Sequence, residues 1–148
     1  AIQDFVAGLS RASMSESTAQ ALATLLRVQH YYDNCHERGA GIGAGRAALA
    51  TLGDESLRLR IIDLAADADD LLVQLDPTQA PFAPLAAHQS ERFEASYEAL
   101  KAAMLAAGAE GRLPIHAMDA LLRSFSDLRR TVQQAAKAAR LLAQLSQA

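Results

Sequence analysis

The fold of this chain is decided by residues 114–147, which read PIHAMDALLRSFSDLRRTVQQAAKAARLLAQLSQ. Apolar or small residues recur in this stretch at alternating intervals of three and four, which places them along one face of an α-helix. They are Met118, Leu121, Phe125, Leu128, Val132, Ala135, Ala139 and Leu142. Pro114 suits the first turn, where its missing N–H would have no partner. A helix of this length, about 50 Å at 1.5 Å per residue, has to bury its apolar face against other long helices.

Length and composition narrow the class of protein. The chain has 148 residues, which fits one domain with its own core. Alanine and leucine dominate, and such residues favour helix over strand. The net charge of −3 argues against an overall basic nucleic-acid-binding protein. The single cysteine, Cys35, cannot form an internal disulfide. No uncharged apolar run approaches the roughly 20 residues of a membrane span, and no signal peptide is visible.

Three further long helices are predicted before the last one. They cover about residues 16–39, 54–76 and 83–108, and short or moderate connectors join them. Residues 2–9 carry apolar side chains at positions i, i+3, i+4 and i+7, which predicts a short extra helix at the N-terminus. The connectors are too brief to mark domain boundaries. We therefore expect a single all-α domain, an antiparallel up-down-up-down four-helix bundle with a short extra N-terminal helix.

Two of these helices have clearly apolar inward faces. In the helix over 54–76 the expected core residues are Leu57, Ile61, Leu64, Ala68, Leu71 and Leu75. In the helix over 83–108 they are Phe93, Tyr97, Leu100, Met104 and Ala107. Gly108 is the expected C-cap of the second of these helices.

The run GAGIGAG, residues 39–45, contains four glycines. Glycine destabilises a helix interior by about 1 kcal/mol relative to alanine. We therefore expect the preceding helix to end near Gly39 and a mobile connector to follow. A phosphate-cradling loop is disfavoured because such loops follow a strand, and no strand is predicted here.

Charge is shared unevenly between two of the predicted helices. Residues 54–76 carry seven acids against two arginines, and residues 114–147 carry two acids against five basic residues. These two helices would sit diagonally in a simple four-helix bundle. Both charged faces are typical of solvated surfaces. Alternatively, Arg123, Arg130 and Lys137, spaced by sevens, form a basic stripe that contacts anionic headgroups or an acidic partner.

The acidic residues also offer a candidate metal site. Asp63, Asp67 and Asp70 share one side of a helix, and Asp33 and Glu37 lie together on another helix beside a histidine. Carboxylates so close repel unless they are solvated, paired or bound to a cation. Surface acids are the first interpretation, and ligands of a divalent or iron ion are the second. No nucleophile lies at usable spacing from a base, so we expect no enzyme.

Two stretches carry a family resemblance: the opening AIQDFVAGL followed by LLRVQHYYDNCHERG, and the later YEALKAAMLAAGAEGRLPIHAMDALLRSFSDLRRTVQQAAKAARLL. The first resembles the first helix of the PhoU-like helical domain at the C-terminal side of bacterial sodium/phosphate cotransporters. The second is the strongest match and resembles the closing helical hairpin of that domain. The resemblance covers most of the chain and is patchy between Gly39 and Pro84.

The resemblance implies a function by contact rather than catalysis. It implies a regulatory domain of a longer transporter, on the cytoplasmic side of the bacterial inner membrane. Its partner would be the transmembrane part of the same transporter or another membrane or signalling protein, and the domain could form homo-oligomers. Relatives of PhoU bind metal through an acid followed four residues later by Asp, which Asp63 and Asp67 match and Asp33 with Glu37 only approach. The alternatives are a free-standing PhoU-like interaction module and a metal-binding helical bundle.

Overall fold

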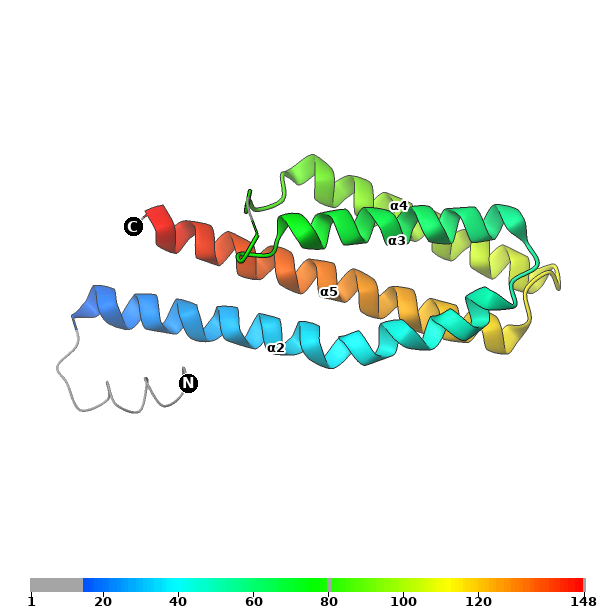
Figure 1. The fold of residues 1–148 in the computed structure, drawn as a ribbon, viewed down its shortest axis with the longest axis horizontal. Helices are drawn as coiled ribbons and strands as arrows, with labels where there is room; N and C mark the ends of the chain where they lie inside the picture. The colour runs from blue at the N-terminus through cyan, green and yellow to red at the C-terminus, as the bar shows by residue number, and fades with distance from the viewer. Residues whose placement is uncertain (1–14, 80, 148) are drawn as a thin grey trace.

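The structure, a computed structural model, describes residues 15–79 and 81–147. This part of the chain contains four α-helices and no strand: α2 (Glu16–Ala50), α3 (Glu55–Gln74), α4 (Ala87–Ala109) and α5 (Ile115–Gln147) (Figure 1). The predicted all-α class is therefore confirmed. The predicted short helix over residues 2–9 lies outside the described residues.

Local side chains and one glycine set the helix ends. The Ser15 hydroxyl accepts a hydrogen bond from the Thr18 amide at 3.2 Å, and the Asp54 carboxylate accepts one from the Leu57 amide at 3.0 Å. Both are N-caps, which satisfy amides that lack a partner inside the helix. Helix α4 continues through Gly108, so the predicted C-cap there is wrong. The turn instead uses Gly111, whose φ of 72° is a conformation that glycine adopts without strain.

Helix α2 continues without a break through the glycine run and ends at Ala50. The predicted helix end near Gly39 and the predicted connector are therefore wrong. Intrinsic propensity disfavours glycine in a helix, but packing against a neighbouring helix overrides a penalty of this size. The packing that does so here is described below with the groove.

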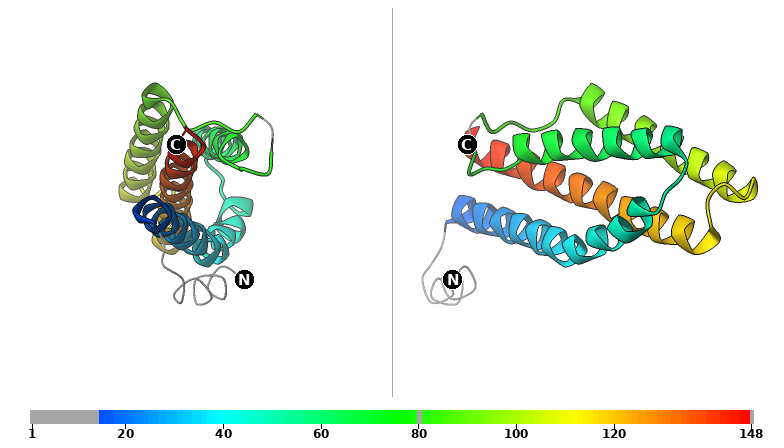
Figure 2. Two further views of the ribbon diagram at one scale, coloured as in Figure 1. Left: turned by 90° about the vertical axis from the view of Figure 1, so that its left-hand side faces the viewer. Right: turned by 45° about the vertical axis from the view of Figure 1, so that its right-hand side comes forward.

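Helix α5 lies at the centre of the arrangement and contacts each of the other three helices. Figures 1 and 2 show α2 along one side of α5, with α3 and α4 on the other side. Helices α3 and α5 pack directly against each other. The expectation that these two oppositely charged helices would sit diagonally, with different neighbours, is therefore wrong.

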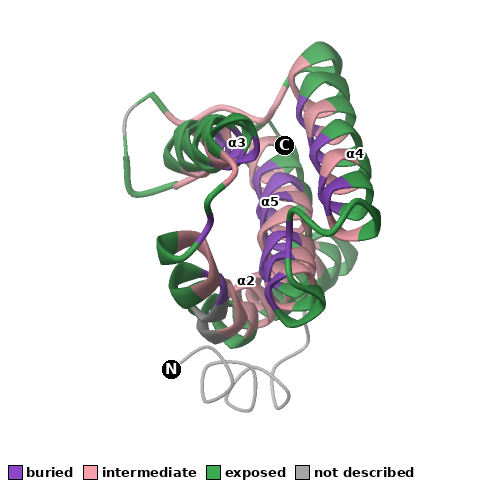
Figure 3. Ribbon diagram, turned by 90° about the vertical axis from the view of Figure 1, so that its right-hand side faces the viewer, coloured by how far each residue is buried: buried purple, intermediate pink, exposed green. Residues whose placement is uncertain are grey.

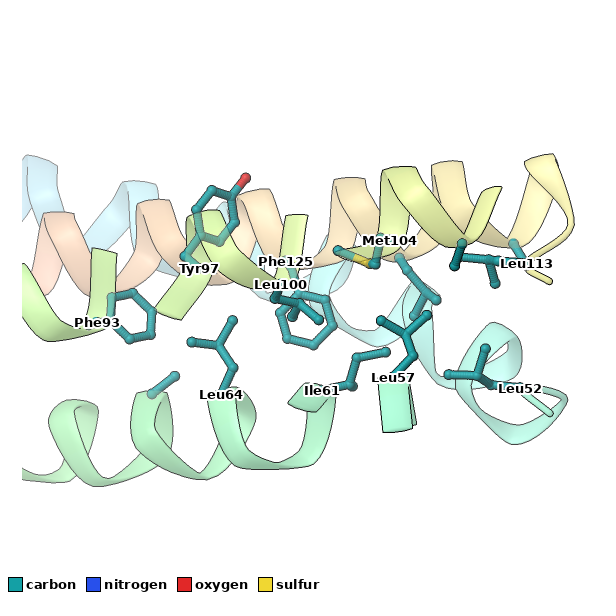
Figure 4. Packing of buried hydrophobic residues seen from close by; sticks show 14 of the residues in the cluster. Leu52, Leu57, Ile61, Leu64, Phe93, Tyr97, Leu100, Met104, Leu113 and Phe125 are labelled. Carbon is teal, nitrogen blue, oxygen red and sulfur yellow. The ribbon is translucent and has the colours of Figure 1, made fainter. Parts of the chain in front are cut away.

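The main core fills the space between α3, α4 and α5. Every inward residue predicted for the helices over 54–76 and 83–108 is buried. Figure 4 shows side chains of α3, including Ile61 and Leu64, pointing toward Phe93, Leu100 and Met104 of α4 and Phe125 of α5. Large interlocking side chains on regular helices produce this contact, so hydrophobic spacing alone was enough to predict it.

Helix α5 is buried on more than one side, and its large apolar residues account for only part of this burial. Of the eight residues on its predicted apolar face, five are buried and three are half-buried. A second line, spaced by sevens, is also buried: Ala117, Ser124, Thr131 and Ala138. Figure 3 shows the buried positions of α5 between its neighbouring helices. The second line explains how one helix can pack against three others.

Candidate interaction groove

Helices α2 and α5 approach each other closely because small residues meet at their contact. A Cβ atom added to Gly45 would lie 2.8 Å from both Cβ and Oγ of Ser124, and one added to Gly41 would collide with the Asp127 carboxylate. The Ser124 hydroxyl donates a hydrogen bond of 2.6 Å to the Ile42 carbonyl. Two of the four glycines therefore allow the helices to approach until a side chain reaches the opposite backbone.

Two further contacts extend this antiparallel pairing toward the start of α2. The Arg38 guanidinium lies 3.3 Å from Asp127, and the Cys35 thiol donates to the Thr131 carbonyl at 3.5 Å. Burial raises the pKa of Cys35. Because the thiolate is the reactive form, this thiol is poorly nucleophilic near neutral pH and fills space in the contact.

The other two glycines of the run border open space. A Cβ atom added to Gly39 or Gly43 would have no neighbouring heavy atom within 4 Å. Each glycine destabilises the helix by about 1 kcal/mol relative to alanine. No contact within the described residues offsets that penalty at these two positions, in contrast to Gly41 and Gly45.

Gly43 lines an apolar groove between α2 and α3 with a volume of about 550 Å³. Leu121, Phe125 and Leu128 of α5 form its floor. The α2 wall includes Ile42 and Leu49, and the α3 wall is formed by Ile61, Ile62, Ala65 and Ala66. Ile62 remains 48% exposed. Concave, mostly apolar surfaces of this kind are where proteins commonly bind ligands.

Charged residues lie in the α2 wall of the groove and beside its α3 wall. Arg46 belongs to its α2 wall. On α3, Arg58, Ile62, Ala65 and Asp69 follow one another at intervals of four, three and four, so they share one side of the helix. This side of α3 therefore carries a basic residue before the groove, apolar residues along it and an acidic residue after it.

On the opposite side of α5, a polar cluster joins α4 to α5. Arg129 binds Glu94 through Nε at 2.7 Å and Nη2 at 2.6 Å, and the Gln133 amide donates to the other Glu94 oxygen at 2.7 Å. The guanidinium also lies 4.7 Å from the Tyr97 ring centre. Burial raises the pKa of Glu94, but the hydrogen bonds from Arg129 and Gln133 outweigh burial and hold the pKa below its ordinary value.

The predicted metal ligands are not brought together. Asp63 and Asp70 are exposed on α3, and Asp67 lies 3.6 Å from the Arg92 guanidinium. Asp33 and Glu37 are exposed on α2. Within residues 15–79 and 81–147, no group of three or more His, Cys, Asp or Glu side chains is placed to hold a metal ion. The two acidic sets therefore lie on separate helices, and one carboxylate already faces a cation.

The predicted basic stripe lies on one exposed side of α5. Arg123, Arg130 and Lys137 are all exposed. Arg123 forms an ion pair of 2.6 Å with Asp119 on its own helix, and Lys137 lies 5.9 Å from the Tyr31 ring centre. Surface contacts of this kind stabilise a fold by less than about 1 kcal/mol, so these side chains remain accessible to a partner.

Sequence reasoning missed the α2 wall of the groove, because it assigned Gly39–Gly45 to a connector. Two signals pointed to them. One is the pair of glycines four apart, Gly41 and Gly45, and the other is the heptad line of small residues on the last helix. Together they are typical of two helices in close contact.

Comparison with known proteins finds no matching family, no matching curated protein and no matching solved structure. Among the helices of the described residues, none is both long enough and apolar enough to cross a membrane.

Proposed function

We propose that this chain is a docking domain that acts by contact, and that its α2–α3 groove receives the apolar face of an amphipathic helix from a partner protein. The observation that carries the proposal is the 550 Å³ apolar groove with exposed Ile62 on its wall. An amphipathic helix laid in a groove buries anchors spaced by three and four residues. The small residues Gly43, Ala65 and Ala66 leave room for such anchors.

Charge complementarity specifies the partner further. On α3, Arg58 precedes the groove residues and Asp69 follows them, and Arg46 lies on the α2 wall. A complementary helix carries acidic residues at the end that faces the arginines and basic residues at the end that faces Asp69. Charges placed in this way fix direction and register more than they add affinity.

The family resemblance supplies a finer form of this proposal. In that form the chain is a PhoU-like up-down-up-down bundle that regulates a sodium/phosphate cotransporter from the cytoplasmic side of the membrane. The resemblance of the closing hairpin, residues 97–142, supports it. The test is the gene: hydrophobic spans encoded upstream of Ala1 are expected, and an open reading frame that begins at Ala1 contradicts this form while leaving the docking groove untouched.

The docking proposal is tested by site-specific photocrosslinking in cells that produce the whole protein. A crosslinking residue replaces Ile62 in the groove or, as a matched control, Leu105, which is 46% exposed on α4. Crosslinks from position 62 are expected on the apolar face of a helix in another protein, mapped by mass spectrometry. Equal crosslinking from position 105, or crosslinks from position 62 to a second copy of this chain, contradict the proposal.

A further inference from the structure

A second groove, of about 420 Å³, lies between the first half of α4 and the last half of α5. Its apolar part is lined by Leu85, Phe93, Val132 and Ala136. Phe93 and Val132 also belong to the main core. The groove is on the α4 side of α5 and does not share a residue with the α2–α3 groove.

Three cations of α5 line the polar side of the same groove: Arg129, Lys137 and Arg140. Its one carboxylate, Glu94, is already bound by Arg129 and Gln133. Lys137 and Arg140 are exposed and make no ion pair within the part of the chain that the structure describes. The groove therefore carries a net positive charge of about two at neutral pH.

The N-terminus of α4 adds to this positive potential. The helix begins at Ala87, between Leu85 and Ser90 of the groove lining. The Gln89 side chain accepts a hydrogen bond from the Ala86 amide at 2.9 Å, but Ala86 itself has no side-chain oxygen to accept from the amides of the first turn. The Ser90 hydroxyl is a further donor in the lining.

From this combination we infer that the α4–α5 groove binds a small amphiphilic anion, with a carboxylate head at Lys137 and Arg140 and an apolar chain along Phe93, Val132 and Ala136. Charge-assisted hydrogen bonds hold the head. Burial of apolar surface holds the chain, at about 25 cal/mol per Å². This site is independent of the docking groove, since the two lie on opposite sides of α5.

The inferred ligand has a charged head and an apolar chain, so the probes test the contribution of each part separately. Calorimetric titration of the purified protein uses decanoate below its micelle concentration, octyl glucoside as a neutral amphiphile and acetate as an anion without a chain. Decanoate is expected to bind, and the other two are expected to bind at least about tenfold more weakly, a difference of about 1.4 kcal/mol. Equal binding of octyl glucoside, or no binding of decanoate, overturns the inference.

Variants then locate the site. The double variant Lys137→Gln/Arg140→Gln is expected to weaken decanoate binding about tenfold or more, a loss of about 1.4 kcal/mol. Arg123→Gln on the same helix, which removes an exposed cation outside the groove, is expected to leave the affinity unchanged. Both changes are on exposed side chains, and circular dichroism confirms that each variant folds. Equal weakening by both variants would assign the effect to the overall charge of α5 and overturn the inference.

A bilayer offers the same chemistry, and a third set of measurements distinguishes it from a free anion. Vesicles of phosphatidylglycerol and phosphatidylcholine are tested by sedimentation against the wild type and the double variant. Binding of monomeric decanoate is expected whether or not vesicles bind. Binding to vesicles alone, with no affinity for monomeric decanoate, would assign Lys137 and Arg140 to a membrane-facing surface and contradict a groove for a single amphiphile.

Discussion

The two sides of α5 pack in different ways. Toward α3 and α4 it presents large residues such as Leu121 and Phe125, which interlock in the main core. Toward α2 it presents Ser124, which meets Gly45 and the Ile42 carbonyl, and Thr131, whose carbonyl accepts from the Cys35 thiol. The first contact gains stability from buried apolar area, and the second from close approach with hydrogen bonds to the backbone. One helix thereby holds a rigid three-helix core and a long fourth helix.

This difference explains why a groove opens where it does. Large side chains fill the space between α3, α4 and α5, whereas α2 is held mainly through its contact with α5. Between α2 and α3 the facing residues include Gly43, Ala65 and Ala66, which are too small to fill the gap. The space between α2 and α3 is consequently left open as a groove.

On the side of α5 that carries large residues, shortening a side chain should lower the stability of the protein most. Leu121 is 1% exposed, and Leu121→Ala is expected to lower the free energy of unfolding by about 2–5 kcal/mol, because it removes apolar contacts and leaves a cavity. Urea denaturation measures the change. Leu105→Ala, at an exposed position of α4, is the control and is expected to stay within about 0.5 kcal/mol of the wild type. Equal effects of the two variants would contradict the assigned core.

On the side of α5 that carries small residues, enlarging a side chain should lower the stability of the protein. Ala138 is fully buried on the line of Ser124 and Thr131. Ala138→Leu is expected to destabilise the protein by about 1–3 kcal/mol, because the larger side chain separates the helices. The matched change Ala102→Leu, at an exposed position of α4, should have little effect in the same denaturation assay. Unchanged stability of Ala138→Leu would mean that α2 does not pack closely along this line.

The smallest expected effect concerns pH and the cluster around Glu94. The pKa of Glu94 is lowered in the folded protein, so its contribution is present above the pKa of an unfolded glutamate, about 4.3, and is lost as the pH falls through the folded value. Glu94→Gln should therefore lower stability at pH 7 more than at pH 3. Thermal unfolding at both values measures this.

The control for this pH dependence is Glu91→Gln, an exposed position of the same helix. It should leave the difference between the two pH values close to that of the wild type. A Glu94→Gln penalty that is as large at pH 3 as at pH 7 would show that the carboxylate charge does not stabilise the α4–α5 contact.

The sequence predicts one side of α5 well and the other poorly, for a physical reason. Leu57, Phe93 and Leu121 have a strong hydrophobic signal, and their spacing alone places them in the core. Small residues such as Ser124 and Gly45 have almost none, because their role depends on how closely a distant segment approaches. Local propensity therefore predicts a break in α2, whereas the tertiary contact keeps the helix continuous.

The candidate sites were predictable only in part. The basic stripe of Arg123, Arg130 and Lys137 follows from heptad spacing, and its three members are exposed on one side as expected. The α2–α3 groove was not predictable, because it depends on the continuity of α2 through Gly43. Whether the carboxylates of α2 lie near those of α3 depends on the same tertiary arrangement. The spacing of residues within one helix carries no information about that arrangement.

The most direct test of a continuous α2 packed on α5 compares two alanine substitutions two residues apart. Gly45→Ala should destabilise the protein, because its Cβ would lie 2.8 Å from Cβ and Oγ of Ser124. Gly43→Ala should stabilise it by up to about 1 kcal/mol, because alanine favours the helix and its Cβ meets open space. Opposite signs in the measured free energies of unfolding are the predicted result. The same small change at both positions, as expected for a connector, would contradict the account.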